Sequence, residues 1–144
     1  MGKQQLNWET DFEFLKQKVC KPDELQQGFP NYNEADLESL RSGEAAFIWK
    51  SPLAISAEEA VDMARQAALE MAPEPGQVIR AAALFLSVNP DGGHNLKVAE
   101  TIVQPIQQLV GETTSYFFAP EFCHKGTHFI LATAEGKKEI RTRF

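Results

Sequence analysis

The chain has 144 residues, enough for one domain, and 43% of them are hydrophobic, which suffices for a buried core. Its net charge of -6, with Lys and Arg scattered along the chain, offers no positive surface to phosphates and argues against nucleic acid as a partner. No apolar run reaches the roughly 20 residues of a membrane-spanning helix, so we expect a soluble protein with no membrane partner. No secretory signal pattern is present, and Cys20 and Cys123 lie far apart in the sequence. We therefore expect a cytoplasmic protein whose two thiols are free.

The first 30 residues are expected to form a helical extension and linker (1–30), and residues 31–144 the domain itself. Apolar residues recur at roughly helical spacing from Leu6 onward, and Pro22 closes the run, which predicts a short amphipathic helix. The following stretch, 26–33, is rich in turn-forming residues and marks the boundary between extension and domain.

A short helix and a strand are predicted next. Asn33 is an N-cap for a helix that runs to Arg41, and Gly43 ends that helix. The segment 44–51 is aromatic and apolar and too short for a helix of its own, which indicates a strand.

This strand carries three adjacent large residues, Phe47, Ile48 and Trp49, which must point to both sides of a sheet. One side is then core, and the other has to be covered by the N-terminal helix or by a partner. Trp8 and Phe12 on that helix allow two interpretations: they cover the sheet, or they are presented to another protein as aromatic anchors.

A second helix and a central strand follow. Ser56, with Glu59 three residues later, forms a capping box, and the helix continues with an inner face of Ala and Met until Pro73. The run Val78–Val88 is continuously apolar and bounded by turn residues, which is typical of a central strand covered on both faces.

The remaining elements are one helix and two strands. Helical periodicity returns over Leu96–Val110, where Pro105 is expected to bend the helix. Strands are predicted over Thr113–Ala119 and Thr127–Ala134 and are expected to form an antiparallel hairpin, with the charged tail from Glu135 extending the last strand or fraying. The order of elements predicts an α/β two-layer fold, a sheet of about four strands packed by two to three helices.

Several of these segments resemble the C-terminal domain of the FtsZ/tubulin family, in the same order along the chain. A glycine-led strand (42–47) precedes a capped, alanine-rich helix (56–69), and an apolar strand leads to a Gly-Gly turn (82–96). A closing strand pair (116–119 and 129–134) ends in an Ala-Thr-like sequence. The resemblance implies a free-standing FtsZ C-terminal-like domain that acts as a non-catalytic protein-interaction module. Its expected partner is FtsZ, whose filament assembly it would modulate, or a second copy of this chain in a homo-oligomer.

The resemblance leaves out the part of the family that holds GTP. In the family the nucleotide lies in an N-terminal domain with a glycine-rich loop of GGGTGTG type, and nothing in residues 1–30 resembles this loop. We therefore expect no GTP hydrolysis by this chain alone and no cofactor.

A second departure concerns the loop that in FtsZ reaches the nucleotide of the neighbouring subunit, whose pattern resembles Asn-x-Asp-x-x-Asp. The corresponding residues are Asn31, Asn33 and Asp36, with Glu34 as a nearby carboxylate. The amide of Asn33 cannot take up a proton at neutral pH, so it could position a water but not act as a base. These four residues are the predicted interface with FtsZ; alternatively, Asn33 caps a helix and Asp36 complements the helix dipole.

An alternative function is a small-molecule site or an enzyme built at the strand ends. The turn after the central strand contains Asn89, Asp91, Gly92, Gly93 and His94, at the kind of position where α/β sheets bind ligands. The other interpretation of His94 is a solvated turn histidine.

Cys123, His124 and His128 carry the ligand atoms that zinc prefers, but their spacing is not a standard zinc pattern and no second Cys/His pair lies nearby. We therefore expect no metal site.

Overall fold

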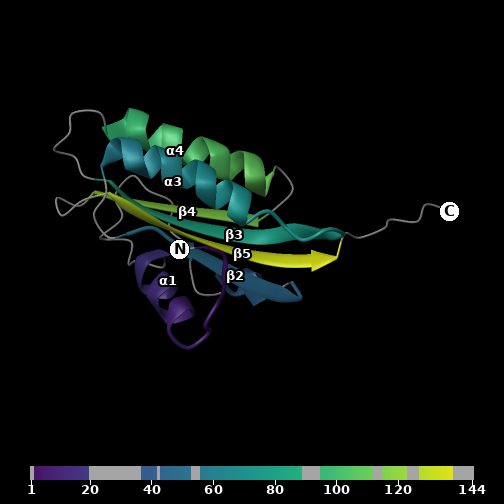
Figure 1. Ribbon diagram of the computed structural model, residues 1–144. Coiled ribbons are helices and arrows are strands. Elements are labelled where there is room, and N and C mark those ends of the chain that lie inside the picture. The colour runs from purple at the N-terminus through teal and green to yellow at the C-terminus, as the bar shows by residue number, and fades with distance from the viewer. Residues whose placement is uncertain are drawn as a thin grey trace.

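A mixed β-sheet runs through the middle of the molecule, with helices on both of its faces (Figure 1). The computed structural model describes residues 2–19, 37–41, 43–52, 56–88, 95–111, 115–122 and 127–137. Within them the elements are, in chain order, β1 (Gln4–Gln5), α1 (Asp11–Val19), η2 (Glu38–Arg41, a 3-10 helix), β2 (Ala45–Lys50), α3 (Ala57–Glu70), β3 (Gln77–Val88), α4 (Asn95–Val110), β4 (Ser115–Phe122) and β5 (His128–Lys137). The described strands form one sheet in the order β1-β2-β5-β3-β4, which confirms the predicted α/β fold and adds a short strand, β1, that was not predicted.

The middle of the sheet is formed by β3 and β5, because both strands are buried on both of their faces. Burial is continuous over residues 81–88 of β3 and over residues 129–136 of β5. β4 pairs with β3 in parallel, whereas β5 pairs antiparallel with both β3 and β2. The apolar run at Val78–Val88 is therefore a central strand, as predicted.

The predicted antiparallel hairpin of the last two strands is wrong. β3 lies between β4 and β5, so these two strands do not pair with each other. α4 carries the chain from the end of β3 back to its beginning, which makes β4 parallel to β3. β5 pairs with the other edge of β3. At this position helices cover both faces of β5, so its apolar side chains are buried.

α3 and α4 lie over one face of the sheet (Figure 1). Their inner stripes pack on side chains of the strands, and the buried members of this layer include Ala60, Ala64, Ala67, Ile102, Ile106, Trp49, Leu84 and Phe129. The opposite face is covered by α1 and by residues 37–41, which include η2. Buried side chains of this second layer include Leu6, Phe12, Leu15, Leu37, Leu40, Ile48, Phe85 and Ile130. Ile48 and Trp49 thus lie in different layers, which confirms that the strand around them faces both sides.

Local signals in the sequence mark the predicted helices. The Ser56 hydroxyl accepts the Glu59 amide at 3.2 Å and the Glu59 carboxylate accepts the Ser56 amide at 3.4 Å, so the predicted capping box of α3 is confirmed. α4 contains Pro105 within its span. No helix in the described parts of the chain is long and apolar enough to cross a membrane.

The N-terminal helix begins later than its apolar spacing indicated. The Asn7 side chain accepts the amides of Glu9 and Thr10, and the Asp11 carboxylate accepts the Asn7 amide at 3.0 Å. These two side chains cap the helix in the way that Asn and Asp favour. The residues before the cap are extended, and β1 pairs antiparallel with β2.

Candidate functional site

The outer surface of the two parallel-running helices α3 and α4 carries the most exposed large hydrophobic side chain in the described part of the chain. Leu69 is 80% exposed. The inner stripe of α3 runs through Ala60, Ala64 and Ala67, and helical periodicity places Leu69 on the opposite side of the helix. Beside it lies a hollow of about 400 Å³ between the two helices, lined by Arg65, Ala68, Leu69, Pro105, Gln108 and Leu109. We call these six residues the α3–α4 seam.

The seam carries little charge. Its one ionic side chain is Arg65, whose guanidinium lies 4.0 Å from the Asp62 carboxylate one turn earlier. Both side chains are well exposed, so this pair is weak and Arg65 can turn to another acceptor. A chain with a net charge of -6 therefore has, at this place, an apolar surface with no carboxylate in its lining.

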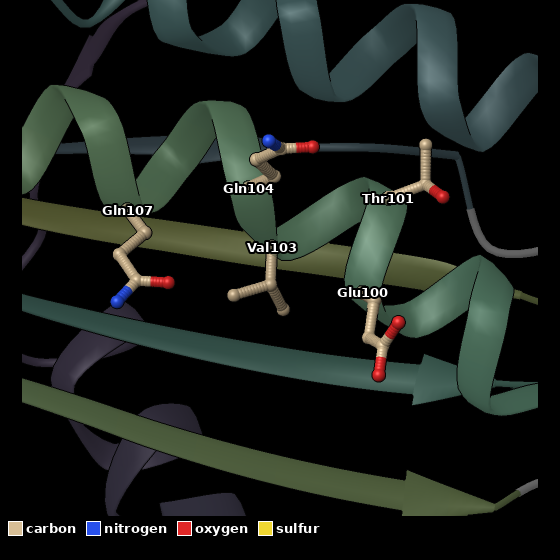
Figure 2. Close-up of a pocket in the computed structure, with 5 residues that line it drawn as sticks. All are labelled: Glu100, Thr101, Val103, Gln104 and Gln107. Carbon is tan, nitrogen blue, oxygen red and sulfur yellow. The ribbon is translucent and has the colours of Figure 1, made fainter.

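A second hollow, of about 480 Å³, lies along α4 (Figure 2). Figure 2 shows Glu100, Val103 and Gln107 on the side of α4 away from α3, and Thr101 and Gln104 on the side nearer to α3. Amide and hydroxyl groups dominate this lining, and they offer both donors and acceptors to a partner backbone. The apolar seam thus has a polar neighbour on the same helix.

A third group of side chains lies where β3 and β4 end. Ser87, the last but one residue of β3, is 0% exposed, and its hydroxyl has no hydrogen-bond partner among the described residues. Its register partner on β5 is His128, whose ring lies 5.6 Å from that of Phe85. From α1, the Lys18 ammonium lies 5.5 Å from the centre of the Phe85 ring and 5.9 Å from that of Phe14. We call Phe14, Lys18, Phe85, Ser87 and His128 the strand-end cluster.

Two of the predicted sites lie outside the described residues, so they stay predictions. They are the interface loop (Asn31, Asn33, Glu34 and Asp36) and the ligand turn (Asn89, Asp91, Gly92, Gly93 and His94). The turn follows directly after β3, next to the strand-end cluster in the sequence.

The two predicted aromatic anchors make contacts within the chain. Phe12 is 3% exposed and belongs to the core layer under α1. Trp8 is half-buried, its ring lies 5.5 Å from that of Phe12, and the Arg41 guanidinium lies 4.0 Å from its centre. Both rings therefore help to cover the sheet, and a role of Trp8 toward a partner stays a prediction.

Cys123 and His124 lie outside the described residues, and His128 packs against Phe85 in the strand-end cluster. Within the described ranges no three His, Cys, Asp or Glu side chains are grouped so that they could hold a metal ion.

A buried ion pair joins the two ends of the described chain, and no motif or spacing in the sequence predicts it. The Lys3 ammonium lies 2.5 Å from the Glu135 carboxylate, which is 2% exposed, and 4.3 Å from the centre of the Phe47 ring. The Glu74 amide donates to the same carboxylate at 3.0 Å, and Lys3 donates to the Ala72 carbonyl at 3.3 Å. This pair fixes the N-terminal segment against the end of α3 and against β5.

Comparison with known proteins identifies the fold. An FtsZ dimer from M. jannaschii matches with a TM-score of 0.50 and 16% sequence identity, over 81% of this chain and 38% of the FtsZ chain. The chain has an FtsZ-like fold. It spans less than half the length of that FtsZ chain. No protein-family model matches the sequence, and no curated protein matches it. The predicted FtsZ/tubulin-like resemblance is thus confirmed for the fold.

Proposed function

We propose that this chain is a non-catalytic protein-interaction module that contacts a protein of FtsZ type, or a second copy of itself, through the α3–α4 seam. The exposure of Leu69 beside an apolar hollow is the observation that carries the proposal. The FtsZ chain with the same fold is described as a dimer, which supports a role in association.

The energetics of the seam favour a protein partner. Full burial of a leucine side chain stabilises a contact by roughly 1.5–3 kcal/mol, and Leu69 is 80% exposed in the isolated chain. The adjacent hollow can receive an apolar side chain of the partner, so that the protruding Leu69 and a cavity for the partner lie next to each other. An apolar centre with a polar border is the usual arrangement of an interface, and the Gln and Thr side chains of the second hollow provide that border.

We expect this chain to modulate the assembly of FtsZ filaments. Head-to-tail growth of a filament requires two complementary surfaces on each subunit. A module with only one of them would occupy a filament end without extending it. We propose the loop Asn31 to Asp36 as a second contact with FtsZ, on the resemblance of its residues to the family pattern.

The decisive experiment compares Leu69→Glu with Gln66→Glu, which places the same charge on an exposed position of α3 outside the seam. Polymer sedimentation and GTP turnover of the FtsZ from the same organism are measured with each protein titrated in, and self-association is measured by sedimentation equilibrium. We expect the wild type and Gln66→Glu to change FtsZ assembly or to self-associate, and Leu69→Glu to do so at least about tenfold more weakly.

Two results would contradict the proposal. Equal activity of both variants would exclude the seam as the contact. A wild-type protein that stays monomeric and leaves FtsZ unchanged at molar excess would exclude the interaction function itself.

A second candidate function is the binding of a small molecule at the strand ends, near Asn89 to His94. It is favoured by one observation, the buried hydroxyl of Ser87, which lies two residues before this turn and has no hydrogen-bond partner among the described residues.

A further inference from the structure

We propose that the strand-end cluster binds a small oxyanion, a carboxylate or a phosphate, held by Lys18, Ser87 and His128. The inference deepens the second candidate function and is independent of the protein-interaction role, because the cluster lies under α1, on the sheet face opposite to the α3–α4 seam.

The hydroxyl of Ser87 is the first observation. It is 0% exposed and has no hydrogen-bond partner among the described residues. A buried hydroxyl without a partner costs roughly 1–3 kcal/mol, so a partner supplied by a ligand would relieve a real penalty. Thr133 is also buried, and its hydroxyl has no hydrogen-bond partner among the described residues, but it lies in the middle of β5 and faces α3 and α4, away from Lys18 and His128.

The second observation is the set of groups around the same position. Ser87 and His128 are opposite each other on neighbouring antiparallel strands, which brings their Cβ atoms to about 5 Å. Lys18 reaches the neighbouring Phe85 ring from α1 and contacts it through a cation-π interaction. An ammonium has three N–H donors and an imidazole has one or two, so together with the hydroxyl they match the several acceptor lone pairs of an oxyanion.

The position in the sheet agrees with this chemistry. β3 and β4 are parallel, and their carboxyl ends, at Val88 and Phe122, lie at the same edge of the sheet. Ligands of open α/β sheets bind outside the carboxyl ends of the strands. The first residue of β5, His128, lies at this edge too, since β5 runs antiparallel to β3.

The test measures thermal stability of the whole chain against increasing sodium phosphate and, separately, sodium succinate, each at constant ionic strength set with sodium chloride. NMR spectra of the imidazole of His128 are recorded along the same titrations. We expect saturable stabilisation by one of the two anions, with a shift of the His128 signals at the same midpoint. Stabilisation by phosphate would identify the ligand as a phosphate, and stabilisation by succinate would identify it as a carboxylate.

Matched variants locate the site. Lys18→Met and Ser87→Ala are each expected to raise the apparent Kd about tenfold, since each removes a donor to a charged acceptor. Lys16→Met makes the same charge change on α1, and Thr133→Val removes an unpaired buried hydroxyl elsewhere; both should leave the Kd unchanged. Lys18 is only half-buried, so its variant keeps the test valid even if Ser87→Ala fails to fold.

Three outcomes would overturn the proposal. Stabilisation equal to that of sodium chloride alone would show a general salt effect. A rise in stability of both Ser87→Ala and Thr133→Val, without any saturable anion effect on the wild type, would show that both hydroxyls are merely unpaired core groups. Unchanged anion affinity of Lys18→Met would place the anion elsewhere. Leu69→Glu should leave anion binding intact, which separates this inference from the proposed protein contact.

Discussion

The carboxylate of Glu135 illustrates how strongly one buried residue depends on one partner. It is 2% exposed, and its charge is balanced by the Lys3 ammonium from the other end of the described chain. No periodicity or motif links the two positions, so the sequence could not predict the pair; only the register that places β1 beside β2, and β2 beside β5, brings them together. A charge left in such a place without its partner cannot be hydrated.

Replacement of Lys3 by Met should therefore lower the free energy of unfolding by about 3 kcal/mol, because Glu135 would keep its desolvation cost and lose its counter-charge. The measurement is urea-induced unfolding. Lys50→Met is the control, since Lys50 pairs with Asp11 at 2.7 Å but is 48% exposed, and its loss should cost about 1 kcal/mol or less. Equal losses for the two variants would show that the Lys3 pair is no more important than the pair of the half-exposed Lys50.

Among the elements, the kind of each one except the short strand β1 was predictable, and the pairing of strands was not. The capping box of Ser56, the alternation of Ile48 and Trp49, and the apolar run of β3 are local signals, and each of them was interpreted correctly. The run Thr127 to Ala134 indicates a strand, but no local signal says whether its neighbour is the strand just before it or β3. That choice is decided by burial across the whole sheet.

Replacement of Gly43 tests how closely the chain before β2 approaches the backbone of β5. A Cβ atom at Gly43 would collide with the backbone carbonyl of Glu135, and the neighbouring Glu44 amide donates to that same carbonyl at 2.8 Å. Because backbone atoms cannot swing away as a flexible side chain can, we expect Gly43→Ala to destabilise the fold by about 1–3 kcal/mol. Gly2→Ala, whose added Cβ would meet only ordinary contacts, is the control in the same thermal unfolding measurement. A Gly43→Ala protein as stable as the control would refute the close approach.

At the scale of the whole molecule, the candidate sites depend on tertiary neighbours. The outward direction of Leu69 follows from helical spacing, but the hollow beside it exists only because α4 brings Pro105 and Leu109 to the same surface. Ser87 is one residue in an apolar run, and nothing in the sequence shows that it faces His128 or that Lys18 reaches the ring of Phe85, two residues before it. The resemblance to FtsZ gave the fold, and the residues that it marked as functional lie outside the described part.

The division into an extension (1–30) and a domain (31–144) remains a prediction, and the packing of the N-terminal segment offers a test of it. Leu6, Phe12 and Leu15 are each at most 4% exposed and pack on the face that contains Phe85 and Ile130. Burial of three such side chains stabilises by roughly 5–9 kcal/mol, which is comparable to the total stability of many domains. We therefore expect a fragment of residues 31–144 to aggregate or to lack a cooperative thermal transition. A soluble fragment with the full transition temperature would instead support the division.

The place of β5 in the sheet has a consequence during synthesis. β5 is the last of the described strands to leave the ribosome, yet it lies between β2 and β3, which are made long before it. Until it arrives, β2 and β3 each have an unpaired edge toward the gap, and Lys3 has no counter-ion from Glu135. Unpaired edges invite pairing with other chains, so a nascent or prematurely terminated chain is the form most in need of chaperones or proteases. The sheet is closed by the last of its described strands.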